Sequence, residues 1–204
     1  LRLRIVIGQE RVQSLDLLAR KVPADNMAGY TNCISRMRDD IETAIQHPAL
    51  QEPAAALLAA IQVLEETTGA VLGGMMAIDM GGPFNKAAYA FSIGIFTDTG
   101  DGSLMAAVMA GGMIPPLAIG IATLIFKNKF TDIEQKSGLS NILLGLSFIT
   151  EGAIPFAAAD PMRVIGSSIV GSAIAGGLTQ LWAVSIPAPH GGLFVITLAN
   201  RPLM

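Results

Sequence analysis

The chain has 204 residues, of which 51% are hydrophobic and only 14% are charged, and its net charge is −3 at pH 7. Charged residues normally make up about a quarter of a soluble domain, so this composition argues against an ordinary soluble protein. The absence of a basic patch argues against nucleic acid as a partner, and the single cysteine excludes an internal disulfide.

The charges are unevenly distributed, because residues 1–52 contain roughly half of them. This asymmetry predicts a short soluble segment over 1–52, followed by a membrane domain over 53–204. Within the first segment, Ile5–Ile7 resembles a short strand and Arg11–Lys21 a short amphipathic helix. Helical spacing continues over Asp39–Ala49 and Glu52–Leu64.

The apolar part begins with Ala54–Asp79, which predicts a helix that starts outside the lipid and enters it near Thr67. Phe84–Phe96 is moderately apolar but short, and Asp98–Gly102 has the composition of a turn. Ser103–Phe126 has no charged residue and is long enough to span a hydrocarbon core of about 30 Å.

Two prolines, Pro115 and Pro116, should kink the Ser103–Phe126 span, as neighbouring helices allow in membranes. Lys127–Lys136 is predicted to be a charged loop. Its three lysines place it on the cytoplasmic side, because basic loops stay inside.

The remaining apolar stretches are Ser137–Ala159, which Glu151 and Pro155 interrupt, and the uncharged span Val164–Ile186. Leu193–Ala199 is too short to cross. Small residues should let the Val164–Ile186 helix pack closely against a neighbour; they are Ser167 with Gly171 and Ser172 with Gly176.

These elements predict an all-α polytopic membrane protein with broken or re-entrant helices, preceded by a short soluble segment and located in the cell's inner (cytoplasmic) membrane. The alternative is a soluble protein with unusually apolar buried helices.

Polar residues within apolar stretches are candidates for function, because an ionisable group at the centre of a membrane helix costs at least about 2.5 kcal/mol. In Asp79–Lys86, two glycines and Pro83 should break a helix and present Asp79, Asn85 and Lys86 to a cavity. The alternative is an ordinary surface loop.

Glu151 lies alone in an apolar run and precedes a glycine. Such a carboxylate can accept a hydrogen bond from a sugar hydroxyl and take its proton during attack on phosphorus. The alternative is a helix-end glutamate at the membrane interface. His190 lies among helix breakers and could bind a hydroxyl or transfer a proton, although a simple loop position explains it equally well.

At these three places the sequence resembles the membrane component, enzyme IIC, of the fructose-specific phosphotransferase system. The stretches that carry the resemblance occur in the family's order and extend over about residues 67–204. They are Met80-Gly-Gly-Pro-Phe-Asn-Lys-Ala-Ala88, Phe148-Ile-Thr-Glu-Gly-Ala-Ile-Pro-Phe-Ala-Ala-Ala-Asp-Pro161 and Pro189-His-Gly-Gly192.

The resemblance implies that a cavity made by broken helices binds fructose or a similar sugar, and that a IIB partner phosphorylated on cysteine donates the phosphate. On this interpretation Glu151 contacts the sugar and is the catalytic base, and Asn85 and His190 are polar groups of the cavity. Lys86, also counted among the substrate-binding residues, holds the loop or offsets phosphate charge. The resemblance also implies a homodimer surrounded by membrane lipid, and neither a cofactor nor a metal is expected.

The segment Asn26-Met-Ala-Gly-Tyr-Thr-Asn-Cys-Ile-Ser-Arg-Met-Arg38 looks like the phosphocysteine loop of glucose-type IIB domains. In that interpretation Cys33 is the nucleophile, and Arg36 and Arg38 lower its pKa and bind phosphate. The alternative is a stray thiol in an amphipathic segment.

Three functions therefore stay open for the chain. It is a sugar permease that couples transport to phosphorylation, a transporter or channel without phosphorylation, or an incomplete permease fragment without catalytic activity.

Overall fold

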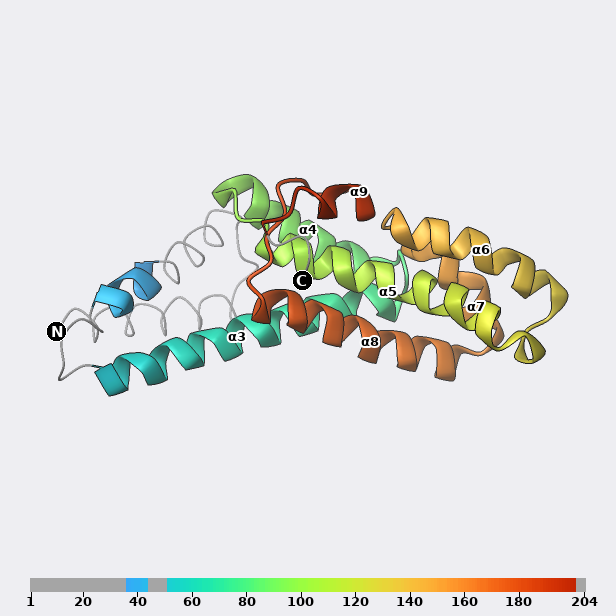
Figure 1. The fold of residues 1–204 in the computed structure, drawn as a ribbon, viewed down its shortest axis with the longest axis horizontal. Helices are drawn as coiled ribbons and strands as arrows, with labels where there is room; N and C mark the ends of the chain where they lie inside the picture. Colours follow the sequence, from blue (N-terminus) through green and yellow to red (C-terminus); the bar gives the residue numbers. More distant parts are fainter. Residues whose placement is uncertain (1–35, 44–50, 201–204) are drawn as a thin grey trace. The chain divides into compact units, whose positions relative to one another are not determined.

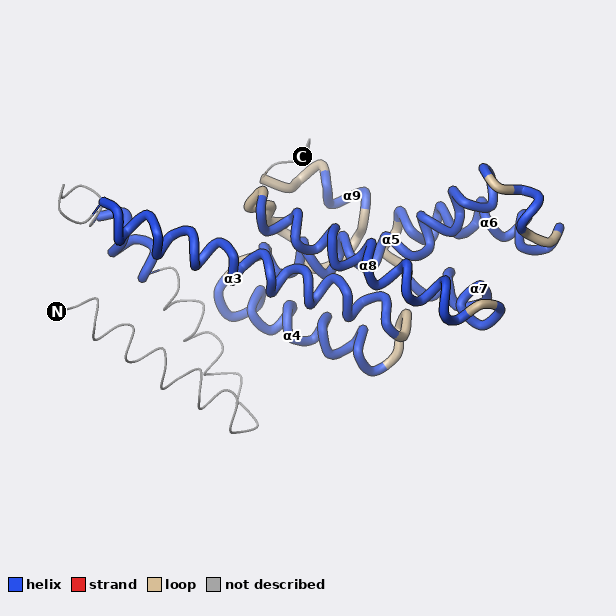
Figure 2. Tube along the Cα trace, turned by 90° about the horizontal axis from the view of Figure 1, so that it is seen from below, coloured by secondary structure: helices blue, strands red, loops and turns tan. Residues whose placement is uncertain are grey.

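The computed structural model describes residues 36–43 and 51–200. Throughout these residues the regular structure is helical, and the described ranges contain no strand (Figure 2). The prediction of an all-α protein is confirmed. The predictions for Ile5–Ile7, Arg11–Lys21 and Cys33 concern residues outside the described ranges.

The chain divides into two compact units, residues 1–63 with 97–99 and residues 64–96 with 100–204. In the first unit, a helix over residues 36–43 buries Met37 and Ile41 together with Ala54 and Ile61. The predicted boundary after residue 52 stays a prediction.

The first labelled helix in Figure 1, α3, runs over Gln51–Ile78 and joins the predicted Glu52–Leu64 and Ala54–Asp79 stretches into one element. Helix α4 covers Pro83–Thr99 and ends at Gly100, whose φ of 76° allows a left-handed cap. Helix α5 covers Ser103–Ile125, close to the predicted span.

The predicted loop Lys127–Lys136 is only partly correct. A 3-10 turn, η2, covers Lys127–Lys129, and α6 already begins at Asp132 and runs to Leu146. A capping box starts this helix: the Thr131 hydroxyl accepts from the Glu134 N–H, and Glu134 accepts from the Thr131 N–H at 2.7 Å.

The predicted stretch Ser137–Ala159 is broken, as its glutamate and proline indicated. After α6 it continues as the 3-10 turn η3, Thr150–Ala153, and the short helix α7, Ile154–Ala159. Helix α8 covers Pro161–Leu181 and begins earlier than predicted, because the Asp160 side chain caps it by accepting from the Arg163 N–H. The last element, α9, is Leu193–Ile196.

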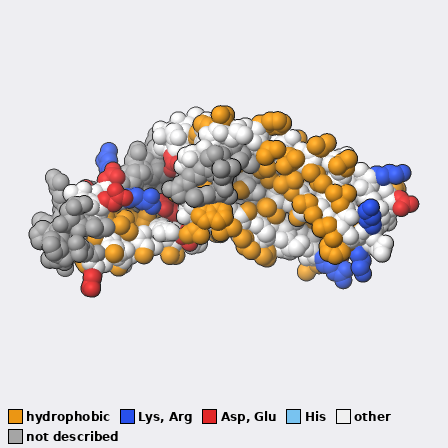
Figure 3. Space-filling view, in the orientation of Figure 1, with side chains coloured by type: hydrophobic (Ala, Val, Ile, Leu, Met, Phe, Trp, Pro, Cys, Tyr) orange, Lys and Arg blue, Asp and Glu red, His pale blue; other side chains and the backbone are white. Residues whose placement is uncertain are grey.

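Among the described residues, three helices are long and apolar enough to cross a membrane: Glu52–Ile78, Ser103–Ile125 and Pro161–Leu181. The stretch Ser137–Ala159 is not among them, because its breaks leave pieces that are too short. On the basis of the three long apolar helices, the chain is a membrane protein. The face drawn in Figure 3 carries many hydrophobic side chains among the described residues, and on α8 Val170 and Ile174 are 60% and 58% exposed.

Close helix contacts are made by glycines on the second unit's part of α3, on α5 and on α8. A Cβ built on Gly111 of α5 would lie 2.6 Å from the Gly73 Cα of α3, and one on Gly176 of α8 would lie 3.0 Å from the same Cα. Helix α3 therefore meets both neighbours at backbone distance. The predicted role of Ser172 and Gly176 is confirmed, whereas Ser167 is exposed.

Helix α5 continues through Pro115 and Pro116, both of which are buried. Proline has no N–H, so the carbonyls four residues earlier, Gly111 and Gly112, lose their helical donors. The Ser172 hydroxyl donates to the Gly111 carbonyl at 2.7 Å, and the Thr150 hydroxyl donates to the Gly112 carbonyl at 2.9 Å. Both freed carbonyls are thus satisfied by other elements of the bundle.

Candidate functional site

The break between α3 and α4 has an unusual backbone, as the sequence predicted. Met80 and Gly81 have φ angles of 44° and 110°. The Asp79 carboxylate caps α4, because its two oxygens accept from the backbone N–H groups of Phe84 at 2.7 Å and Asn85 at 3.0 Å. Asp79 therefore stabilises the break, and each of its two carboxylate oxygens accepts one of these backbone hydrogen bonds.

Asn85 is buried beneath this turn. Its side-chain nitrogen donates to the Met76 carbonyl near the end of α3 at 2.8 Å. The amide thus ties the first turn of α4 to the last turn of α3. Lys86, the next residue, is exposed.

Glu151 lies in η3, and its side chain packs against the α3–α4 break. A Cβ built on Gly81 would lie 2.7 Å from the Glu151 Oε1 and 2.9 Å from its Cγ. Only glycine fits there, for reasons of both φ and space. Residues 70 positions apart in the sequence, from two predicted motifs, therefore meet at one place.

The turn that carries Glu151 is fixed on both sides. Thr150 is anchored to the freed Gly112 carbonyl of α5. On the other side, Gly152 lies so close to α6 that a Cβ would come within 2.6 Å of the Asn141 Oδ1. Glu151 itself is exposed, so its carboxylate is accessible while the turn that carries it is anchored.

The motif at residues 189–192 contacts the same region through Phe148, a residue of the Glu151 motif. Phe148 has a φ of 61° and is 7% exposed. The His190 ring packs edge-on against the Phe148 ring with 5.2 Å between centroids, and Tyr89 of α4 lies 6.3 Å away on the same ring. His190 Nδ1 accepts from the Gly191 N–H at 3.0 Å. That bond assigns the ring proton of neutral His190 to Nε2.

The structure therefore brings all three motifs to the region around Glu151 and Phe148. Of the predicted residues, Glu151 touches the α3–α4 break directly, and Asn85 and Lys86 belong to the helix that this break starts. His190 is connected to the region through Phe148. In the described part of the chain, no group of three or more His, Cys, Asp or Glu side chains could hold a metal ion.

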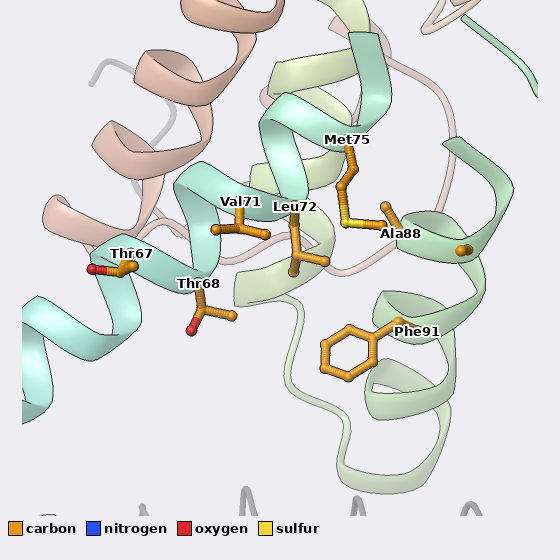
Figure 4. Close-up of a pocket in the computed structure, with 8 residues that line it drawn as sticks. Thr67, Thr68, Val71, Leu72, Met75, Ala88 and Phe91 are labelled. Carbon is orange, nitrogen blue, oxygen red and sulfur yellow. The ribbon is translucent and has the colours of Figure 1, made fainter. Parts of the chain in front are cut away.

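These predicted residues do not line either of two cavities in the second unit. One, of about 450 Å³, lies between α3 and α4 and is almost entirely apolar (Figure 4). Its lining residues are Thr67, Thr68, Val71, Leu72, Met75, Ala87, Ala88 and Phe91. The other lies around α5, α7 and α8.

Sequence reasoning missed the roles of Thr150 and Phe148, and it assigned Ser172 to helix packing without the hydrogen bond that its hydroxyl donates. A signal for the two hydroxyl residues was present, since Pro115 and Pro116 require donors for the carbonyls of residues 111 and 112. Which hydroxyls supply them depends on helix packing. Nothing in the local sequence marks the left-handed backbone at Phe148.

Comparison with known proteins finds relatives that are named as fructose-specific components of a PTS system or as a fructose permease component. The chain is 57% identical over 136 residues to the "PTS system fructose-specific EIIABC component" of Bacillus subtilis (strain 168), covering 67% of this chain and 21% of the relative. It is 54% identical over 136 residues to the "Fructose permease IIC component" of Bacillus amyloliquefaciens, covering 67% and 44%.

A third relative, the "PTS system fructose-specific EIIB'BC component" of Escherichia coli (strain K12), is 54% identical over 130 residues, which is 64% of this chain and 23% of the relative. The chain thus spans less than half the length of each of these relatives. No family model and no solved structure matches it.

Proposed function

We propose that this chain, two thirds of which is similar to fructose-specific IIC components of phosphotransferase systems, takes part in transporting fructose or a similar sugar across the inner membrane, coupled to phosphorylation of the sugar. The multi-pass arrangement, with the η2 turn and the start of α6 on the cytoplasmic side, belongs to this proposal. So does a phosphorylated IIB partner, since relatives named EIIABC and EIIB'BC combine several components.

The observation that carries the proposal is the contact between Glu151 and Gly81. A carboxylate positioned between two helix breaks, in a chain with three apolar spans, is the kind of group that binds a polar solute within a membrane. Its exposure supports a role toward a ligand.

In the proposed reaction, Glu151 accepts a hydrogen bond from the sugar hydroxyl. As the hydroxyl oxygen forms its bond to phosphorus, the phosphorus–sulfur bond of the donor phosphocysteine breaks, the thiolate leaves, and the hydroxyl proton passes to Glu151. Lys86 offsets phosphate charge. His190 offers its Nε2–H to another hydroxyl, and Asn85 fixes the α4 end of the site.

The test is sugar phosphorylation that depends on phosphoenolpyruvate, measured in membranes that contain this chain and the phospho-donor proteins. Wild type should phosphorylate fructose, and Glu151→Gln should do so at least about 100-fold more slowly, since general base catalysis contributes about 10²–10⁴-fold. Glu65→Gln, a change on the same type of side chain in α3, serves as the matched control and should retain activity.

Equal rates for wild type and Glu151→Gln would contradict the site assignment. Uptake of labelled fructose without phospho-donor proteins would favour a transporter without phosphorylation. Correctly inserted chain that neither binds nor phosphorylates fructose would favour an incomplete permease fragment.

A further inference from the structure

The cavity around α5, α7 and α8 has a volume of about 500 Å³ and walls of two kinds. One wall is apolar and follows the two spans. On α5 it includes Ile114, Ala118 and Ala122, which are spaced one helical turn apart and extend over about 12 Å. On α8 it runs over about 10 Å and is made by Val164, Ser167, Ser168 and Gly171, with the Ser167 hydroxyl bonded to carbonyls of its own helix.

This apolar wall is open to the lipid side of the bundle, because Ala118 is exposed and α5 and α8 are both long and apolar enough to cross a membrane. A hydrocarbon chain can therefore enter the groove from the bilayer. Along α5 the hydroxyls of a sugar would find no polar side chain on this wall, because its lining there is Ile114, Ala118, Ile119 and Ala122.

The other wall is charged and carries both signs. Lys129 and Arg163 supply cations, and the Arg163 side chain is 89% exposed. Glu134 and Asp160 supply carboxylates. Figure 3 shows Lys and Arg side chains gathered where the η2 turn and the start of α8 lie.

Both carboxylates are fixed by helix capping. Glu134 belongs to the capping box of α6, and the Thr131 N–H, followed by the Thr131 hydroxyl, holds the pKa of Glu134 below its ordinary value of 4.5. Asp160 caps α8 and lies 3.4 Å from the Arg163 guanidinium. A purely anionic headgroup would meet these two negative charges, whereas a headgroup with both phosphate and ammonium finds an opposite charge for each.

We propose that this cavity binds one membrane phospholipid with a primary amine in its headgroup, of the phosphatidylethanolamine type. The phosphate is bound by Lys129 and Arg163, and the ammonium donates to Glu134 and Asp160. One acyl chain occupies the groove between α5 and α8. The site would anchor the broken α6–α7 region to the bilayer, independently of sugar chemistry.

The experiment is native mass spectrometry of the purified full chain, incubated with equal amounts of phosphatidylethanolamine, phosphatidylcholine and phosphatidylglycerol that carry the same acyl chains. Wild type should retain one phosphatidylethanolamine about tenfold more strongly than either other lipid, which corresponds to about 1.4 kcal/mol. Phosphatidylcholine has the same net charge but a quaternary amine that cannot donate hydrogen bonds to the carboxylates.

Two matched pairs of variants locate the site. The double variant Lys129→Gln/Arg163→Gln should lose the preference, whereas Lys136→Gln, which changes a lysine outside the cavity lining, should keep it. Ala118→Phe should fill the groove and reduce retention of all three lipids. Leu124→Phe, at an exposed position of α5 outside the groove, should not.

Equal retention of the three lipids by wild type would overturn the proposal, and this result needs no variant to fold. Full displacement of the lipid by an equal concentration of soluble glycerophosphoethanolamine would also overturn it, because the acyl groove would then contribute nothing. Neither outcome bears on fructose phosphorylation, so the two proposals fail separately.

Discussion

The carboxylate of Glu151 lies against the backbone of Gly81, so closely that a Cβ at position 81 would be 2.7 Å from the Glu151 Oε1. This contact joins the turn after α3 to the turn η3. Gly81 also has a φ of 110°. The position therefore requires glycine for two reasons, the lack of space for a Cβ and the left-handed backbone. Its substitution is therefore a sharp test of the site.

Gly81→Ala should displace the Glu151 side chain and strain the turn, because a left-handed backbone costs a residue with a Cβ about 1–2 kcal/mol. We expect strong loss of fructose phosphorylation, with a smaller loss of thermal stability in detergent. Gly94→Ala, in the middle of α4 with nothing near the added Cβ, is the control and should leave both measurements unchanged or slightly raise stability. Normal activity of Gly81→Ala would disprove the close contact.

Ser172→Ala should leave the Gly111 carbonyl without its donor in a buried place, at a cost of about 1–3 kcal/mol. Thr150→Val should act in the same way on the Gly112 carbonyl and should also loosen the turn that carries Glu151. Thermal unfolding in detergent measures both effects. Ser167→Ala is the control, since its hydroxyl bonds only to carbonyls of its own helix, and a loss as large as that of Ser172→Ala would count against the proline explanation.

Gly176→Ala should separate α8 from α3, because the new Cβ would meet the Gly69 carbonyl and lie 3.0 Å from the Gly73 Cα. We expect a lower unfolding temperature. The matched change in the same helix is Gly166→Ala, which meets no atom within 4 Å and should be neutral or stabilising, because alanine is the better helix former. Equal effects of the two changes would argue against close packing at Gly176.

Cys33→Ser tests the predicted phosphocysteine, which lies outside the described residues. If Cys33 accepts phosphate, radioactive phosphate transferred from phospho-donor proteins should label wild type and leave the serine variant unlabelled. Labelling that is the same in both chains would remove Cys33 from the mechanism, without affecting the role proposed for Glu151.

Part of the site follows from local chemistry. Gly81, Gly82 and Pro83 follow one another directly, and this run does not continue a regular helix comfortably, so the break after Ile78 was predictable. The glutamate–glycine–proline pattern around Glu151 predicted the break that became η3 and α7. The start of α6 was missed, because a lysine-rich segment reads as a loop until the reciprocal bonds of Thr131 and Glu134 are considered.

The sequence alone determined where this chain is apolar, where its helices break and which carboxylate stands among apolar residues, because these are properties of neighbouring residues. Only the tertiary structure decided that Glu151 meets Gly81, and that Thr150 and Ser172 bond to carbonyls 38 and 61 residues away in the sequence. The reason is physical: each such contact depends on how two helices pack, and that packing is set by many small residues acting together.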